Sequence, residues 1–462
     1  MRWALVVGAF LAACSSETPE YGGFANGSAI LRVGIMQGVD NTLYRSNGRS
    51  PRDTPVIARR DGLLRFFVNT TDGWEPRDLT GVLRLRDGEG ELVEELTSTE
   101  YISGRSSTSD LGSTINFRLT GDQIKQNTEF SFELRETDPS RGGGSREQNS
   151  FDSELQAGGL DPAPTDTLNL VIVPIRYQAD GSSRVPDITP GHIREIEEAM
   201  YALYPTNEVV VRVEEPADWF DEVAPNGAGW GNLLGAVSQR AAQSDEAPNT
   251  YYYGMFDPTT SIQAYCRRGC ILGLATLATI PEDFPRAAIG LGFRGPAVET
   301  LVHEVGHSHG LPHAPCGQVA TFDRDYPYED GEIGVWGYNL VRDQLREPSR
   351  HDMMGYCDPI WISDYNFGII HDRILELRDV QRSQPYEVSR LFIDEAGKAT
   401  SVGTVRVRRP SVSAEMVSVD LYADGELVRT VEGAFEPFDH IGGGAVVLDE
   451  VLADGLTARV RR

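Results

Sequence analysis

The sequence predicts a multidomain chain in which an α/β (α+β) domain lies between an N-terminal and a C-terminal β-sandwich-like domain. Residues 29–137, and again residues 383–462, show the short apolar–polar alternations typical of β-strands. Between them, in residues 166–382, strand-like apolar runs alternate with amphipathic helical patterns, which favours a mostly parallel sheet carrying helices. The length of 462 residues is compatible with about three domains of ordinary size.

The composition is acidic and globular. The net charge of −27 argues against a basic face for nucleic acid or anionic lipid. Hydrophobic residues make up 40% of the chain, yet no apolar run reaches the ~20 residues of a membrane-spanning helix. We therefore expect no nucleic-acid partner, and we expect a monomer.

The first residues are expected to be a targeting segment. Trp3–Leu11 is a short apolar stretch, and Leu11-Ala12-Ala13-Cys14 resembles a bacterial lipobox. Residues 1–13 would then be a signal peptide, Cys14 would carry the lipid, and residues 14–28 would form a tether. Ser15 follows the cysteine, so the outer membrane is the expected destination. The alternative, an ordinary signal peptide, would also export the chain.

The N-terminal domain, residues 29–137, is predicted to be an immunoglobulin-like β-sandwich without catalytic residues. Asp87-Gly88-Glu89-Gly90 indicates a hairpin turn. Residues 138–165 are rich in Gly, Ser and Pro, which predicts a linker. The expected strands are Ala29–Met36, Val56–Val68, Val82–Leu96, Thr114–Thr120 and Phe130–Leu134.

The central domain is predicted to alternate strands and helices. A helix begins near Thr189, a suitable N-cap, with Pro190 at the first helical position. A second helix is expected at Asn232–Gln243. The strands expected here are Leu168–Tyr177, Glu208–Val213 and Thr250–Phe256.

Eleven residues from His303 to His313 follow the pattern H-E-x-x-H-x-x-G-x-x-H. Residues four apart share a helix face, so His303 and His307 can direct their imidazoles at one ion. Gly310 permits the left-handed backbone that ends a helix, and the chain can then bring His313 round as third ligand. Three neutral imidazoles leave a tetrahedral Zn²⁺ one open position, as catalytic zinc sites require. Glu304, beside the first ligand, is the expected general base.

The alternative interpretation is a buried helix with incidental histidines. It is disfavoured because four of the eight histidines of the chain lie in this stretch.

The extended motif resembles that of the metzincin zinc endopeptidases. That family has a methionine turn beneath the metal, and Asp352-Met353-Met354-Gly355-Tyr356-Cys357 is similar to one. The resemblance covers about residues 168–380 and implies that Met354 is the Met-turn residue. It also implies that Tyr356 lies near the zinc and stabilises the transition state.

The same resemblance implies two substrate contacts. In metzincins an edge strand above the cleft binds extended substrate as an added strand. Ala287–Phe293, with Leu291, is the candidate, and an ordinary edge strand or loop is the alternative. The family places the wall of the pocket just beyond the scissile bond at Pro359-Ile360-Trp361. Substrate contact is therefore implied for Trp361, with a place in the core as the alternative.

A narrower resemblance concerns the whole chain. The lipoprotein-like start, the β-rich front domain and Trp361-Ile362-Ser363-Asp364-Tyr365 are similar to secreted bacterial lipoprotein metalloproteases. Some proteins of that kind, the ToxR-regulated lipoprotein group, attack mucin-type glycoproteins. We carry no substrate over from this resemblance.

Four cysteines remain once Cys14 is assigned to a lipid. In an oxidising compartment this even number suggests two disulfides, with three connectivities. We favour Cys266–Cys270, which closes a small loop, and Cys316–Cys357, which would lock the Met-turn beneath the third ligand. The alternative is a second zinc site, but no further His has a suitable spacing.

Two other segments carry weaker signals. Asp323, Asp325, Asp330 and Glu332 could hold a structural Ca²⁺, but they do not follow the EF-hand spacing, and a solvated acidic loop is favoured. In residues 383–462, a hairpin signal around Asp424-Gly425 predicts a small C-terminal β-sandwich with an accessory role.

Together these features predict an exported, lipid-anchored zinc endopeptidase acting on extracellular proteins or glycoproteins. One alternative is a surface adhesin or glycan-binding protein with an inactive metal domain, which the presence of Glu304 disfavours. The other is a zinc amidase acting on a non-peptide substrate, which the masses of the products would distinguish.

Overall fold

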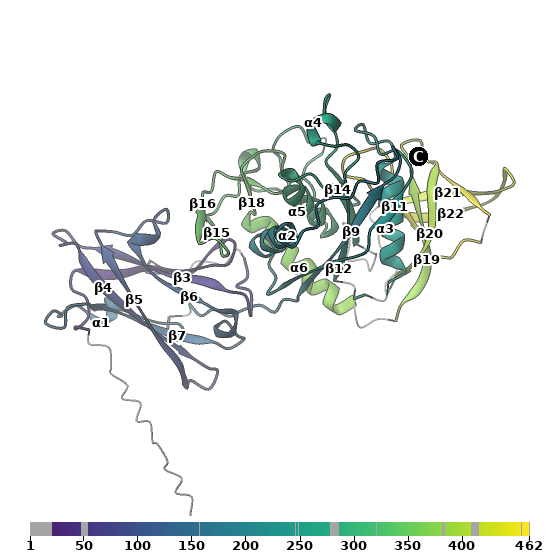
Figure 1. The fold of residues 1–462 in the computed structure, drawn as a ribbon. Helices are drawn as coiled ribbons and strands as arrows, with labels where there is room; N and C mark the ends of the chain where they lie inside the picture. The colour runs from purple at the N-terminus through teal and green to yellow at the C-terminus, as the bar shows by residue number, and fades with distance from the viewer. Residues whose placement is uncertain are drawn as a thin grey trace, which may run out of the picture.

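The computed structural model describes residues 21–47, 54–156, 158–244, 246–247, 249–277, 286–319, 321–380, 384–407, 415–453 and 455–461. Figure 1 shows a unit of two sheets at one end, a helix-bearing unit in the middle and a third, β-rich unit at the other end. The coarse prediction of a multidomain, β-rich chain is confirmed. Within these ranges no helix is both long and apolar enough to cross a bilayer. The predicted lipidation site, Cys14, lies outside them.

The N-terminal unit consists of two four-stranded antiparallel sheets that enclose one core. Phe66 and Phe132, one from each sheet, stack with their ring centroids 3.7 Å apart. Short 3₁₀ helices at Leu111–Ser113 and Gly121–Gln123 precede and follow β6. In order across each sheet, the strands are β2 (Asp40–Arg45), β1 (Ser28–Met36), β3 (Gly62–Thr70) and β6 (Thr114–Leu119), then β5 (Leu92–Ile102), β4 (Arg77–Arg86), β7 (Glu129–Glu136) and β8 (Ser150–Asp152).

Two predictions for this unit need correction. The strand expected at Val56–Val68 begins only at Gly62, because residues 56–61 form an irregular segment against the central unit. The linker expected at 138–165 is largely part of the sandwich. It contains α1 (Arg146–Asn149) and β8, which pairs with β7, and it buries Phe151 and Leu160 in the core. Its apolar residues are too few and too widely spaced to produce a strand signal.

The central unit is built on a sheet of four parallel strands with one antiparallel strand at its edge. Every residue of the central strand β12 is buried, as expected for a strand covered on both faces. The order is β10 (Val209–Val213), β9 (Leu168–Tyr177), β12 (Thr250–Phe256), β14 (Arg286–Leu291) and the edge strand β13 (Gly273–Ala275), and β11 (Ala217–Trp219) pairs with the end of β9.

Helices cover both faces of this sheet. On one face, α2 (Pro190–Leu203), α5 (Pro296–Ser308) and α6 (Asp364–Val380) share a core with β9 and β12. On the other face, α3 (Trp230–Ala242) packs against the alternate residues of the same strands. A one-turn helix, α4 (Ile262–Tyr265), follows β12. The arrangement places α5 beside β14 and the edge strand β13.

The prediction of an edge strand at Ala287–Phe293 is wrong. β14 lies inside the sheet, and the short strand β13 forms the edge. Leu291 is 1% exposed and packs in the core on the α3 side, so it cannot contact substrate. The three residues of β13 are too short a run to be recognised as a strand from sequence alone.

The segment between α5 and α6 consists of short elements. A 3₁₀ turn at Glu329–Gly331 precedes the hairpin of β15 (Gly337–Asn339) and β16 (Gln344–Arg346). β17 (His351–Asp352) then pairs in parallel with β18 (Ile360–Trp361). The chain between β17 and β18 is the predicted Met-turn.

Both disulfides have the pairing favoured from the sequence. Cys266–Cys270 spans 4.8 Å between Cα atoms, and Cys316–Cys357 spans 5.8 Å. The second joins the chain after His313 to the chain after the Met-turn, 41 residues further on.

The described residues of the C-terminal unit form one six-stranded antiparallel sheet, where the sequence predicted a small sandwich. One face of this sheet encloses a core within the unit, which includes Leu391, Val419 and Val446. The other face packs on the central unit, since Phe392, Phe438 and Ala445 share a core with α3. The order is β20 (Ala399–Val407), β19 (Tyr386–Ile393), β23 (Gly444–Leu448), β22 (Glu426–Pro437), β21 (Met416–Ala423) and β24 (Thr457–Arg461).

The N-terminal sandwich docks on the central unit through Arg60. This side chain is fully buried and donates hydrogen bonds to the carbonyls of Gln37, Tyr201 and Thr206. The guanidinium also lies 4.4 Å from the centroid of the Tyr201 ring. A buried cation that satisfies carbonyls of two domains is costly to remove, because those carbonyls lose their partner.

Substitution Arg60→Ala is expected to destabilise the chain by about 3 kcal/mol or more, because buried carbonyls on both sides of the interface lose a charged donor. Thermal unfolding followed by calorimetry measures the effect. Arg105→Ala removes an exposed arginine of the same sandwich and should change the stability by no more than about 0.5 kcal/mol. Equal melting temperatures for the two variants would contradict the proposed role of Arg60.

Candidate active site

Helix α5 brings two of the predicted ligands together. Gly295, with φ of 105°, precedes the helix, and Pro296 occupies its first turn. His303 and His307 then lie one turn apart, and their Nε2 atoms are 3.1 Å from each other. Glu304, on the next position, is 1% exposed. The helix therefore presents two imidazoles and a carboxylate toward the same space.

The chain turns at Gly310 to add the third ligand. Gly310 has φ of 88°, and its amide donates to the carbonyl of His307 while the amide of Leu311 donates to that of Gly306. This turn returns His313 to the end of the helix, where its ring centroid is 4.7 Å from that of His307. In the described part of the chain, His303, His307, His313, Asp439 and His440 form a group whose ligand atoms all lie within 4.8 Å of one another.

A backbone carbonyl orients each of the three histidines. The Nδ1 atoms of His303, His307 and His313 lie 2.8, 2.7 and 3.2 Å from the carbonyls of Met353, Leu311 and Thr321. A carbonyl only accepts, so each Nδ1 carries the proton and each Nε2 is left with its lone pair. The separation of 3.1 Å between two Nε2 atoms is close to the roughly 3.3 Å expected for two ligands about 2.0–2.1 Å from a tetrahedral zinc. These residues fit a metal ion.

The protonation of the three imidazoles also suits a metal. Burial lowers the pKa of His303 well below its usual range, and the neighbouring histidines lower it further. Burial, followed by His307 and His440, lowers the pKa of His313 to about 3. Neutral imidazoles are the form that binds a metal, so the ligands need not lose a proton when the ion binds.

The Met-turn lies beneath the histidines. Asp352 is fully buried, and its carboxylate accepts from the amides of Met354 and Ser363 and from the side chain of Asn366. These bonds fix the turn to the start of α6. Met354 in turn packs against α5, because a Cβ on Gly306 would come within 2.4 Å of its sulfur.

Glu304 and Tyr356 flank the candidate metal centre. Burial, and then the Asp439 carboxylate, raise the pKa of Glu304 well above its ordinary value. One oxygen of this carboxylate, Oε2, is buried without a hydrogen-bond partner. The Tyr356 hydroxyl lies 3.0 Å from Nε2 of His313, and burial raises its pKa, so it keeps its proton. A carboxylate and a hydroxyl thus face one space from two sides.

Two residues of the site come from the C-terminal unit and were not predicted. Asp439 and His440 lie in the loop between β22 and β23, and His440 Nε2 is 3.2 Å from Glu304, which is 136 residues distant in the chain. A unit that was predicted to be accessory thus contributes two residues to the candidate site. An Asp-His pair in a glycine-rich loop is the one local signal, and nothing in the sequence ties it to a motif so far away.

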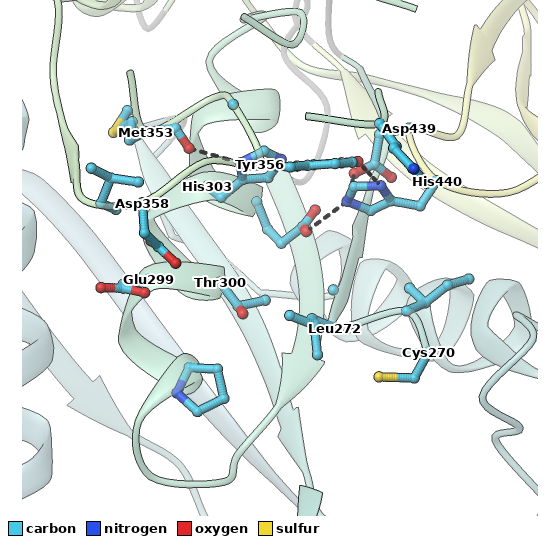
Figure 2. Close-up of a pocket in the computed structure, with 17 residues that line it drawn as sticks. Cys270, Leu272, Glu299, Thr300, His303, Met353, Tyr356, Asp358, Asp439 and His440 are labelled. Atoms are coloured by element: carbon cyan, nitrogen blue, oxygen red, sulfur yellow. Dashed lines mark hydrogen bonds and ion pairs between the residues drawn. The ribbon is translucent and has the colours of Figure 1, made fainter. Parts of the chain in front are cut away.

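A cleft of about 440 Å³ leads to the candidate centre. Figure 2 shows Glu299 and Asp358 at one end and Asp439 and His440 at the other, with Leu272 between them. The lining residues are Cys270, Ile271, Leu272, Gly273, Pro296, Glu299, Thr300, His303, Glu304, Gln318, Met353, Gly355, Tyr356, Asp358, Ile360, Asp439 and His440.

Trp361, a predicted substrate contact, does not line this cleft. It is 5% exposed, and its indole nitrogen donates to the carbonyl of Gly38 in the N-terminal sandwich. The alternative interpretation, a core tryptophan, is correct, and the neighbouring Ile360 lines the cleft instead. Ile360 and Trp361 are successive residues of β18, so their side chains point to opposite sides and only that of Ile360 faces the cleft.

The predicted calcium ligands do not form a cluster. Asp323, Asp325, Asp330 and Glu332 are absent from the groups able to hold a metal among the described residues. Asp323 instead accepts from the Tyr365 hydroxyl and from the amide of Asp325. The solvated acidic loop is the better description of this segment.

Comparisons with known proteins match the same region. Residues 290–357 match the family model described as Peptidase M66. Dictomallein-1 of Dictyostelium discoideum is 28% identical over 99 residues, which cover 20% of this chain and only 16% of that relative. These matches support a metallopeptidase family.

Comparison with solved structures adds nothing about the site. A Bacteroides uniformis β-glucuronidase 2 is 11% identical over 50% of this chain and 29% of its own, with a TM-score of 0.15. A β-glucuronidase from glycoside hydrolase family 2 is 11% identical over 88% of this chain and 49% of its own, with the same TM-score. At such low TM-scores the similarity supports no inference about the fold or the function of this chain.

Substitution Gly306→Ala is expected to weaken metal binding by about 10- to 100-fold, although alanine usually stabilises a helix. The added methyl group would meet the sulfur of Met354 and displace the Met-turn, whose Met353 carbonyl orients His303. Competition with a chelator measures the affinity.

Gly368→Ala in α6 is the matched control, because no atom lies within 4 Å of the added methyl group. It should bind metal like the unmodified chain. Undiminished metal affinity in Gly306→Ala would show that the contact between α5 and the Met-turn does not support the ligands.

Proposed function

We propose that this protein is a zinc-dependent endopeptidase of the metzincin type that hydrolyses extracellular proteins or glycoproteins. The observation that carries this proposal is the convergence of three oriented imidazoles beside the buried carboxylate of Glu304, one oxygen of which has no partner. That set combines a metal centre with a base, which is what hydrolysis of a peptide bond requires. The family match to residues 290–357 agrees with it.

Several features favour the metzincin type. The third histidine follows a glycine turn, and a methionine turn packs beneath the ligands through Gly306 and Met354. The zinc helix follows a mostly parallel sheet whose edge strand, β13, runs antiparallel and contributes Gly273 to the cleft. An edge strand in this position can bind an extended peptide by adding it as another strand.

The groups around the centre have distinct roles in this mechanism. Zinc, when bound, supplies a Lewis acid that polarises a carbonyl and acidifies water. Glu304 accepts the proton of the attacking water and delivers it to the leaving nitrogen. Tyr356 donates a hydrogen bond to the oxygen that becomes negative in the transition state. Because Glu304 is buried, bulk water does not reach the proton that its carboxyl group carries.

The location of the protein is part of the proposal. Two disulfides agree with an oxidising compartment, since such bonds are rare in reducing ones. We propose that the chain is exported, anchored through a lipid at Cys14 and active as a monomer at the cell envelope, with the flanking units at residues 29–137 and 383–462 as parts of one enzyme.

Substitution Glu304→Gln is expected to lower cleavage of casein or a mucin by about 10²- to 10⁴-fold while the bound zinc remains. A zinc chelator should abolish cleavage by the unmodified chain. Glu347→Gln changes an exposed carboxylate away from the cleft and should leave cleavage unchanged. Mass spectrometry of the products identifies the bond that is broken.

Three outcomes would contradict the proposal. A chain without bound zinc would exclude the three histidines as ligands. Products that do not arise from peptide hydrolysis would favour an amidase, and zinc binding without turnover of any substrate would favour an adhesin.

Substitution Tyr356→Phe is expected to lower kcat by about 100-fold or more and to change KM little, because the hydroxyl acts on charge that develops only in the transition state. Steady-state kinetics on one peptide substrate separates the two constants. Tyr365→Phe removes a hydroxyl that bonds Asp323 outside the cleft and should retain the activity. A rise in KM alone would assign Tyr356 to substrate binding.

A further inference from the structure

The loop between β22 and β23, residues 438–443, enters the cleft of the candidate enzyme. The strand ends that carry this loop are held by an ion pair and by aromatic packing. Arg390 and Glu436 form a buried ion pair of 2.7 Å, and Arg390 also donates to Thr276 near the edge strand. Phe438 packs on Phe392, with ring centroids 6.1 Å apart. The loop is therefore delivered to the cleft by the docking of the whole C-terminal sheet.

The loop backbone runs along the edge of the central sheet. The amide of Leu277 donates to the carbonyl of Pro437 over 3.2 Å, and the amide of Asp439 donates to Ala275 over 3.4 Å. Thr276 pairs with Phe438 in antiparallel register between these two bonds. Ala275 is the last residue of β13, and Gly273 of the same strand lines the cleft. The loop thus occupies part of the edge to which a peptide strand could be added.

The Asp439 side chain reaches the metal centre. Its Oδ1 accepts from the amide of Ala275 over 3.1 Å. Its Oδ2 lies 2.9 Å from Nε2 of the neighbouring His440 and 3.2 Å from Nε2 of His307. The carboxylate is 1% exposed. A distance of 3.2 Å between donor atoms again matches two ligands of one tetrahedral ion. Asp439 is thus placed as a fourth ligand, which would turn an open catalytic site into a closed one.

His440 engages the two groups that would act on substrate. Its Nε2 is 3.2 Å from Glu304, and its Nδ1 is 2.5 Å from the Tyr356 hydroxyl. The imidazole lies parallel to that of His303, with 5.8 Å between ring centroids. Base, hydroxyl and metal position are therefore all occupied by two consecutive residues of one loop.

We propose that the β22–β23 loop is an intrachain pseudosubstrate, in which Asp439 is the fourth ligand of the resting metal centre and must leave before a peptide carbonyl can bind. This inference rests on the proposed zinc-peptidase function. Release concerns residues 439–443 alone, because the ion pair of Arg390 and the packing of Phe438 hold the hairpin base in place. An incoming chain competes for the edge groups of β13 as well as for the metal.

The test replaces the carboxylate by an amide of the same shape. Asp439→Asn keeps the oxygen that accepts from Ala275 but removes the anionic ligand. Zinc affinity, measured against a chelator, is expected to fall by about tenfold or more. A small hydroxamate would bind the metal at the position that the Asp439 carboxylate is proposed to hold. The affinity of zinc-loaded Asp439→Asn for this compound is therefore expected to rise by about tenfold or more.

Asp449→Asn is the matched control, since Asp449 is an exposed residue that follows β23 in the same sheet and accepts a hydrogen bond from the Tyr386 hydroxyl. Both affinities should equal those of the unmodified chain. The visible spectrum of the cobalt-loaded proteins gives a second measurement, in which Asp439→Asn alone should differ.

The outcomes separate this inference from the proposed function. Zinc in all three proteins with equal hydroxamate affinities would overturn the pseudosubstrate and leave the peptidase standing. Loss of cleavage in Asp439→Asn without tighter hydroxamate binding would make Asp439 part of the catalytic machinery and also overturn it. Faster cleavage by Asp439→Asn, with tighter hydroxamate binding, would support it. Absence of zinc from the unmodified chain would overturn both proposals.

Discussion

The hydrogen bond between Nδ1 of His303 and the carbonyl of Met353 connects the two halves of the candidate centre. It orients a ligand of α5 by means of the Met-turn, which belongs to a separate segment of the chain. The turn is itself held by Asp352, whose buried carboxylate caps the segment leading into α6. Without this sequence of contacts His303 would lose the acceptor that orients its ring, although His307 would keep its own acceptor at Leu311. The geometry of the metal centre therefore depends on a carboxylate that never approaches the metal.

The central sheet determines which surface can meet substrate. Parallel strands need helices on both faces, so the only accessible backbone lies at an edge, and the edge nearest to α5 is β13. Gly273 of this strand lies so close to Glu304 that a Cβ there would be 2.5 Å from its Cγ. The backbone groups of such an edge can pair with any extended chain, and the amide of Asp439 pairs with the carbonyl of Ala275. In our proposals, substrate binding and self-inhibition use the same strand edge.

Much of the site was predictable because its ligands are local. The spacing of His303, His307 and His313 is a property of one helix and one turn, and Met354 and Tyr356 are recognised from a short motif. The helices and most strands of the central unit followed from periodicity, since their apolar faces are long. Glu304 was predictable as the general base from its position between His303 and His307 in the motif.

The failures have a common physical cause, which is that each depends on long-range packing. β13 is a strand only because β14 offers it an edge, and Trp361 faces the sandwich only because β18 turns it away from the cleft. The buried residues of the predicted linker have partners in a sheet formed much earlier in the chain. Asp439 and His440 reach the centre through the docking of a whole sheet. No local pattern encodes such encounters.

The contact of Trp361 with the N-terminal sandwich has an evolutionary consequence. Trp361 pairs with Asp352 in β17 and β18, and its carbonyl accepts from the amide of Met353. The residue whose ring contacts Gly38 is therefore one hydrogen bond away from Met353, which orients His303. Because of this contact, the N-terminal domain is not expected to be exchangeable for an unrelated one. An unrelated N-terminal domain would have to reproduce the loop at Gly38. Otherwise the Met-turn beneath the histidines would lose part of its support. The sandwich and the peptidase-like unit are therefore expected to have diverged together, as one heritable piece.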